Sequence, residues 1–280
     1  MIRLGTCSWA DAGLLATWYP PSVRTSEERL RHYAQRFDMV EVDSPFYRLP
    51  TPETTARWAE RTPDGFTFHV KASGELTGHR PADLADSVRA FRAAVEPLEA
   101  SGKLRGVLLQ YPPWVAKSRE AARGILETAA LLEPLVPVVE FRHASWLVPE
   151  ELETTLELCR RNGLAFVSLD TPGNALPMVA AATHELAYVR FHGRNRETWF
   201  KKVDTSAERF DWLYDRAELA EWVEPLRRLD EEAVEVHALF NNNRDDFAPR
   251  SAQLLRGLLD EAGIEATGGI EPEPAAPTVF

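Results

Sequence analysis

The strongest constraint on the fold is the regular alternation of short apolar segments with longer amphipathic ones along nearly the whole chain. Eight segments have the length and the β-branched or aromatic content of buried strands. They lie at 2–9, 39–44, 66–72, 106–111, 137–143, 165–170, 186–193 and 234–243. Patterns with helical spacing separate most of them, at 26–37, 52–60, 82–98, 119–132, 149–161, 210–229 and 252–262. Eight such units in about 260 residues predict an α/β fold, a single-domain (β/α)8 barrel of the TIM type.

The same alternation also occurs in open, doubly wound sheets, which are the structural alternative. The first strand-to-helix turn lacks G-x-G-x-x-G, however, and the chain contains no P-loop pattern. The hydroxyl of Ser26 is expected to cap the helix that begins there. Residues 1–265 are predicted to form the barrel, and the Gly-, Glu- and Pro-rich stretch 266–280 a flexible tail.

Composition restricts the possible partners and the compartment. No run approaches the roughly 20 apolar residues that span a bilayer, and the first strand follows Met1 at once, without room for a secretory signal. The two cysteines, Cys7 and Cys159, suit reduced core thiols. A soluble, cytoplasmic protein without a membrane partner is expected. The net charge of −11 makes nucleic acid an unlikely partner.

Polar side chains gather where the predicted strands end. In the strand that begins at Pro137, Glu140 and Arg142 lie two residues apart and should therefore point the same way. A glutamate and an arginine directed into one enclosed space must pair or meet a ligand. Comparable residues end the other strands, and in a barrel these ends form the functional face. The predicted set is Glu41, Lys71, Gln110, Glu140, Arg142, Asp170, Arg190, His192 and Asn241.

Several neighbours of these residues are expected to have structural roles. Asp43 is expected to cap the following turn, and His143 to lie outside the barrel, because it is out of phase with Arg142. His69 lies one layer deeper than Lys71 and is as readily a core imidazole as a functional one. Asn241 and Asn242 cannot both point inward in a regular strand.

Aromatic residues collect at the same predicted face. They either stack on a sugar or a base, or cover the rim of the barrel, and the sequence leaves both roles open. The residues are Trp9, Trp18, Tyr19, Phe46, Tyr47, Tyr111, Trp114, Trp146 and Trp199.

A series of short motifs resembles a known family. GTCSW, WYPP, VEVDSPFYRLP, FHVKA, LLQYPP, VEFRHASW, YVRFHGR and FNNN occur in this order between Ile2 and Leu259, as in the YecE-like family, also called domain of unknown function 72. The resemblance implies a soluble (β/α)8 barrel and no assigned reaction. The chain departs from the family pattern with Cys7 and Ser8 in place of serine and glycine, and with Asn243 where aspartate is common. The matching site positions are Glu41, Tyr47, Lys71, Gln110, Glu140, Arg142, Arg190, His192 and Asn241.

The leading functional hypothesis is an enzyme of hydrolase or lyase type, acting on a small anionic, sugar-like or phosphorylated substrate. Its expected catalytic residues are Glu41, Lys71, Glu140 and His192, with an ionised Glu140 held by Arg142 and Arg190. No metal or organic cofactor is expected. A glycosidase is disfavoured, because Gln110 and Arg190 end the strands that carry glutamates in the largest barrel clan of glycosidases. The expected substrate-binding residues are Trp9, Tyr19, Tyr47, Gln110, Arg142, Asp170, Arg190 and Asn241.

Two other classes of function stay open. A metal-dependent phosphodiesterase or endonuclease would use Glu140, Asp170 and His192 as ligands, although few histidines reach the predicted mouth. A non-catalytic barrel would bind a small molecule without turning it over. Metal analysis distinguishes the first alternative from the leading hypothesis, and recovery of an unchanged ligand identifies the second.

Overall fold

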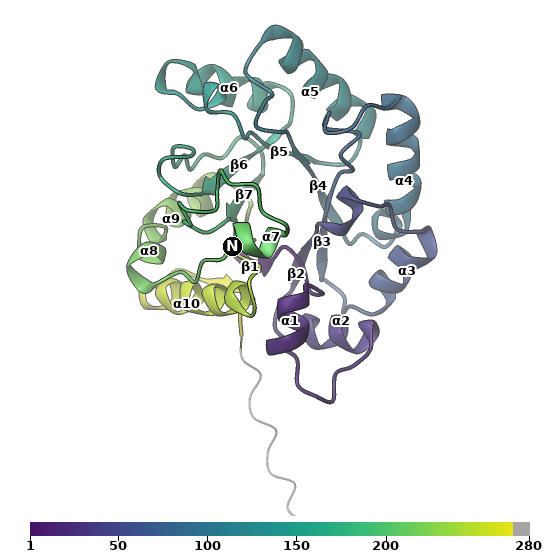
Figure 1. Cartoon of the computed structure of the whole chain (residues 1–280), viewed down its shortest axis with the longest axis vertical. Helices are drawn as coiled ribbons and strands as arrows, with labels where there is room; N and C mark the ends of the chain where they lie inside the picture. The colour runs from purple at the N-terminus through teal and green to yellow at the C-terminus, as the bar shows by residue number, and fades with distance from the viewer. Residues whose placement is uncertain (271–280) are drawn as a thin grey trace, which may run out of the picture.

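The computed structural model of the chain describes residues 1–270, in which eight parallel strands close into a ring surrounded by helices (Figure 1). The strands follow one another in chain order, and β1 closes the ring by pairing with both β8 and β2. The predicted (β/α)8 barrel is therefore confirmed. The strands are β1 (Ile2–Thr6), β2 (Met39–Val42), β3 (Thr67–Lys71), β4 (Leu104–Gln110), β5 (Pro137–Glu140), β6 (Ala165–Asp170), β7 (Leu186–Phe191) and β8 (Glu235–Phe240).

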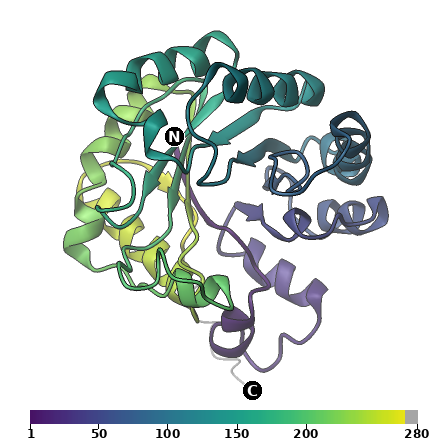
Figure 2. The ribbon, with the colours of Figure 1, turned by 45° about the horizontal axis from the view of Figure 1, so that its top comes forward.

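The helices surround the strands (Figures 1 and 2), except that a short one, α7 (Ser206–Arg209), lies near the centre of the ring in Figure 1. None within residues 1–270 is long and apolar enough to cross a membrane. Three of them have the predicted bounds, because a proline or a serine marks each start. These are α3 (Pro52–Glu60), α5 (Arg119–Leu132) and α6 (Pro149–Arg161). The others are α1 (Ala12–Thr17), α2 (Ser26–Ala34), η1 (Ser44–Phe46), α4 (Leu84–Ala100), η2 (Ala144–Trp146), α7 (Ser206–Arg209), α8 (Arg216–Ala220), α9 (Val223–Glu232) and α10 (Phe247–Glu261).

Local chemistry corrects two helix predictions. Thr25, not Ser26, caps α2, since its side chain accepts from the backbone N–H of Glu28 in a reciprocal capping box. The predicted helix at 210–229 is divided into α8 and α9. A capping box at Asp215 starts α8. Pro225, in the first turn of α9, has no N–H to continue a hydrogen-bond ladder from α8.

The barrel extends beyond residue 265, where the sequence predicted that it ends. The short strand β9 (Ala266–Thr267) pairs with Ile2 and Arg3 of β1, whereas the other end of β1 pairs with β2. Figure 2 shows the yellow C-terminal segment beside the purple first strand. A Cβ at Gly268 would lie 2.2 Å from the carbonyl oxygen of Leu4, so this approach requires glycine. The expected tail boundary at residue 266 is thus too early, and the rest of the predicted tail, 271–280, lies outside the described residues.

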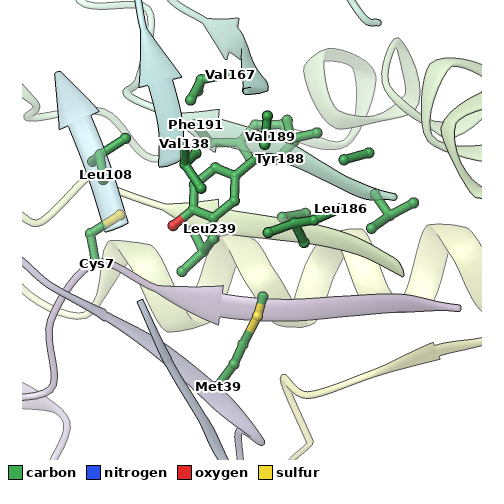
Figure 3. Packing of buried hydrophobic residues seen from close by; sticks show 14 of the residues in the cluster. Cys7, Met39, Leu108, Val138, Val167, Leu186, Tyr188, Val189, Phe191 and Leu239 are labelled. Atoms are coloured by element: carbon green, nitrogen blue, oxygen red, sulfur yellow. The ribbon is translucent and has the colours of Figure 1, made fainter. Parts of the chain in front are cut away.

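The barrel interior is filled by alternate residues of the strands. Tyr188 of β7 lies at its centre among inward-pointing side chains such as Leu108, Val138 and Leu239 (Figure 3). One layer deeper, Nε2 of His69 lies 2.7 Å from Nδ1 of His237, and both imidazoles are fully buried. His69 is therefore a core residue rather than part of the mouth.

Candidate active site at the barrel mouth

One arginine joins two carboxylates at the centre of the barrel. Arg190 of β7 donates to Glu41 of β2 at 2.5 Å and to Glu140 of β5 at 2.5 Å, and all three side chains have 0% exposure. The hydroxyl of Tyr188 donates to the second carboxylate oxygen of Glu41 at 2.7 Å. The strand ends thus converge as the sequence predicted, through a bridge in which one cation serves two anions.

Glu140 has further partners that fix its surroundings. Arg142 pairs with its second carboxylate oxygen through Nε, and Nε2 of His192 lies 3.5 Å from the same oxygen. The amide nitrogen of Asn241 lies 2.8 Å from Nδ1 of His192. If this amide donates, the neutral imidazole carries its proton on Nε2, facing Glu140.

These surroundings shift the pKa values of the two glutamates, Glu140 and Glu41, in opposite directions. Burial raises the pKa of Glu140, but Arg142 and Arg190 outweigh burial and hold that pKa well below its usual range. This agrees with the predicted ionised state. Burial raises the pKa of Glu41 to about 7; Arg190 opposes this increase and Asp43 adds to it. Burial and then Arg142 lower the pKa of His192 to about 3, so its imidazole is neutral at pH 7. Of the two carboxyl groups, Glu41 is the one suited to carry a proton.

A cavity of about 950 Å³ lies at the C-terminal mouth, next to this network. Six of the predicted residues line it: Trp9, Tyr47, Lys71, Gln110, Arg142 and Asn241. Glu41, Glu140, Arg190 and His192 are fully buried and do not line it. They contact residues that do, because Glu140 pairs with Arg142 and His192 with Asn241. The network therefore supports the cavity wall from the barrel side.

Three donor side chains from neighbouring strands face this cavity. Nζ of Lys71 is 3.9 Å from a carboxylate oxygen of Asp43 and 4.6 Å from the ring centre of Phe46, and it makes no hydrogen bond to any described residue. The side-chain amide of Gln110 likewise has no hydrogen-bond partner within residues 1–270. Arg142 stacks 5.2 Å over Trp199 and uses Nε for Glu140, which leaves its two terminal nitrogens without a hydrogen bond in the described chain. These donors are available to a ligand.

Besides Arg190, two further predicted binding residues do not line the cavity. Tyr19 donates to the backbone carbonyl of Trp9 at 2.5 Å, so it supports a cavity residue without lining the cavity itself. Asp170 has the parity opposite to the inward residues of β6 and points toward the helices. It accepts from Trp222 at 2.7 Å, Tyr214 at 2.5 Å and Arg194 at 2.7 Å. The expectation that Asp170 binds substrate is corrected, because these partners engage its carboxylate outside the barrel.

The ligand set of the metal-dependent alternative is not assembled, since Asp170 points away from Glu140 and His192. Within residues 1–270, no three side chains among His, Cys, Asp and Glu are grouped closely enough to hold a metal ion. Both cysteines are free and buried. Burial and Glu41 keep the pKa of Cys7 well above its usual value, as expected for a core thiol.

Two aspartates outside the predicted set also line the cavity. Asp43 precedes η1 but makes no capping hydrogen bond, and it lines the cavity beside Lys71 and 3.7 Å from Arg190. Asp11 also lines the cavity, from the loop after β1. In the sequence, the position of Asp11 before a short helix indicates only a capping residue, not a residue of the cavity.

The neighbouring polar residues lie where the strand parity placed them. His143 binds the backbone and hydroxyl of Ser145, outside the mouth. Asn242 points outward and donates to Ser251 at 3.0 Å, whereas Asn241 points inward.

Comparison with known proteins identifies the family. The model of the family described as "Protein of unknown function DUF72" matches residues 3–277. UPF0759 protein YunF of Bacillus subtilis (strain 168) is 31% identical over 280 residues, which are 96% of this chain and 97% of that protein. UPF0759 protein YecE of Escherichia coli (strain K12) is 30% identical over 197 residues, 67% of this chain and 64% of that protein.

Solved structures of the same family have this fold. A DUF72 family protein from Enterococcus faecalis V583 matches with a TM-score of 0.83 and 25% identity over 100% of both chains. One from Thermotoga maritima MSB8 matches with a TM-score of 0.81 and 28% identity over 93% of this chain and 99% of that one. The chain belongs to the DUF72 family, as its motifs predicted.

Proposed function

We propose that the mouth cavity binds a small anionic substrate, sugar-like or phosphorylated, and that the protein is an enzyme acting on it by acid/base and electrostatic catalysis. The observation that carries this proposal is a set of donors, on β3, on β4 and just after β5, that make no hydrogen bond within residues 1–270. They are Nζ of Lys71, the side-chain amide of Gln110 and the terminal nitrogens of Arg142. A largely buried ammonium without a hydrogen bond is costly, and an anion would supply the missing acceptor.

The chemistry of the donors favours an oxyanion. Hydrogen bonds between charged groups are about twice as strong as neutral ones. The fork of an arginine matches two oxygens of a carboxylate or phosphate, while a lysine adds a point charge. Trp9 and Trp199 also line the cavity and give apolar surface to the rest of such a ligand.

The buried network has a positioning role in this proposal. Arg190 holds Glu140, and Glu140 holds Arg142 at the cavity wall. A cation fixed in this way needs no reorganisation when negative charge develops on the substrate. Lys71 is the member of the expected catalytic set that reaches the ligand directly. Glu140 and His192 act through Arg142 and Asn241, and Glu41 lies beside Cys7, which lines the cavity.

Anion binding can be measured before the substrate is known. Calorimetric titration with inorganic phosphate should show saturable binding to the wild-type protein. Lys71→Met should weaken it by about tenfold or more, the value of one charge-assisted hydrogen bond. Lys202→Met is the matched control, because Lys202 is exposed and does not line the cavity. Equal affinities of the Lys71 variant and the wild type would refute the anion site.

A second measurement distinguishes an enzyme from a ligand-binding barrel. Anionic metabolites that co-purify can be identified by native mass spectrometry and returned to the protein after removal. Conversion by the wild type, lost in Lys71→Met, supports catalysis, and recovery of the unchanged metabolite favours the binding protein. Because the proposal uses no metal or organic cofactor, dialysis against EDTA should leave binding unchanged.

A further inference from the structure

Asp11 has the position of a helix cap but does not act as one. It is the N-cap residue of α1, where an aspartate ordinarily accepts a hydrogen bond from a backbone N–H of the first turn. Its side chain makes no such bond. The carboxylate lines the mouth cavity, close to the polar side chains of Ser8 and Asn243. Helix capping therefore does not account for this carboxylate.

Close packing fixes the place of Asp11. A Cβ on Gly13 would lie 2.5 Å from the backbone nitrogen of Asp245 and 2.7 Å from its Cα. The first turn of α1 thus rests directly on the loop between β8 and α10. Asn243 belongs to the same loop and also lines the cavity, so the loops after β1 and β8 meet beside the Asp11 carboxylate.

The surroundings of Asp11 make its charge responsive to a ligand. Asp43, just after β2, is a like charge. Burial and, to a smaller extent, the Asp11 carboxylate raise the pKa values of Tyr47 and Tyr19. Burial and then Asp43 raise the pKa of Asp11 to about 6, against the opposing hydrogen bonds from Ser8 and Asn243. The carboxylate of Asp245, on the packed loop, lies 3.6 Å from Arg244.

We propose that Asp11 is a catalytic residue that exchanges a proton with the anion held by Lys71, Gln110 and Arg142, an inference that rests on the proposed function. The carboxylate takes a proton from an O–H or C–H bond of the substrate, and the electron pair of that bond stays on the substrate. Lys71 and Arg142 stabilise the resulting negative charge. The proton is returned when product forms, so the step needs no oxidant or reductant.

Sulfate tests the coupling, because it remains a dianion over the useful pH range. An anion bound beside Asp11 favours the protonated carboxyl, so binding takes up a proton. The affinity of the wild type for sulfate should rise about fivefold or more between about pH 7.5 and about pH 5. Asp11→Asn should lose most of this rise. Asp204→Asn, which removes another cavity carboxylate, should keep it. An Asp11→Asn variant with the pH dependence of the wild type would overturn the inference.

Carboxyl ¹³C NMR tests Asp11 directly, with the resonance assigned by its loss in Asp11→Asn. The titration midpoint should lie near 6 in the wild type. It should fall in Asp43→Asn, which removes a like charge, and rise in Asn243→Ala, which removes a donor to the carboxylate. A purely structural aspartate would not show these opposite shifts. A wild-type midpoint near about 4, unaffected by Asp43→Asn, would contradict the inference.

The two proposals fail in different ways. Absence of sulfate and phosphate binding at every pH refutes the anion site itself. Sulfate binding that leaves the Asp11 midpoint unmoved refutes the role of Asp11 alone. A midpoint that rises in the sulfate complex of the wild type, but not in that of Lys71→Met, supports both.

Discussion

Arg190 and Glu140 meet at 2.5 Å in the middle of the barrel, and neither side chain has any exposed surface. The pair links β7 to β5, and through Glu41 it also links both strands to β2. A charge pair removed from water in this way is stable as long as each partner keeps the other. The main consequence of this pair concerns Arg142, which lies between Glu140 and the cavity. The fixed carboxylate of Glu140 holds Arg142 in place.

Removal of one partner should therefore cost much more than a surface charge. Glu140→Gln leaves Arg190 and Arg142 without their shared anion, and we expect it to lower the free energy of unfolding by about 3–5 kcal/mol. Urea denaturation at pH 7 measures this loss. Glu150→Gln is the control, because Glu150 is exposed in the first turn of α6. A loss below about 1 kcal/mol for Glu140→Gln would mean that water reaches the pair.

The glycine facing His69 gives a second prediction. A Cβ on Gly106 would lie 3.0 Å from Nδ1 of His69 and 2.9 Å from Cγ2 of Val138. Gly106→Ala should thus destabilise the protein by about 1–3 kcal/mol through overpacking. Gly124→Ala is the matched control, because its Cβ would meet nothing within 4 Å and Gly124 is in the helix α5. That control should be neutral or stabilising by up to about 1 kcal/mol. Thermal unfolding of the two variants would contradict this account if their effects were equal.

The buried imidazoles predict a loss of stability in acid. Burial lowers the pKa values of His69, His192 and His237. Below about pH 6.5 the unfolded chain binds protons that the folded chain does not, so each histidine removes stability as the pH falls. The raised pKa values of Asp11 and Glu41 act in the opposite direction.

The contribution of a single histidine can be isolated in one variant. His192→Gln should reduce the slope of unfolding free energy against pH, between about pH 4 and about pH 6, by about 1.4 kcal/mol per pH unit. Urea unfolding at several pH values measures this difference. Identical slopes in the wild type and the variant would show that His192 is protonated in the folded state.

Substitution of Asp170 should lower the stability of the protein without changing its affinity for phosphate. Asp170→Asn weakens the contacts to Trp222, Tyr214 and Arg194, so we expect a loss of about 1–3 kcal/mol in unfolding free energy. Phosphate binding should stay within about twofold of the wild type, because Asp170 does not line the cavity. Loss of phosphate binding by a folded Asp170→Asn protein would restore this residue to the site.

The fold could be predicted because each strand and most helices carry local signals. The apolar segments are of strand length, and the starts of α3, α5 and α6 have their own proline or serine. The division of 210–229 into two helices has local signals, the capping box at Asp215 and Pro225, which helical spacing alone does not take into account. The pairing of β9 with β1 depends instead on tertiary contacts that no local pattern records.

The site was predicted where strand parity determined it. Alternate residues of the parallel strands point inward. This parity brings together Glu41, Lys71, Glu140, Arg142, Arg190 and His192. Parity could equally have excluded Asp170, which follows the inward-pointing Leu169. Depth along the barrel axis could not be predicted, so the four residues buried beneath the cavity were not separated from Lys71 and Arg142, which line it. Asp11 was not predicted, because it lies in a loop, where no strand or helix periodicity indicates the direction of a side chain.

The central claim is that an anion binds to Lys71, Gln110 and Arg142. Crystals soaked in selenate, a sulfate analogue with an anomalous signal, would test it most directly. We predict one selenium peak in the mouth cavity, with its oxygens within hydrogen-bonding distance of Lys71 and Arg142, that is absent from crystals of Lys71→Met. Selenate bound only outside this cavity, or bound in it equally well without Lys71, would contradict the claim.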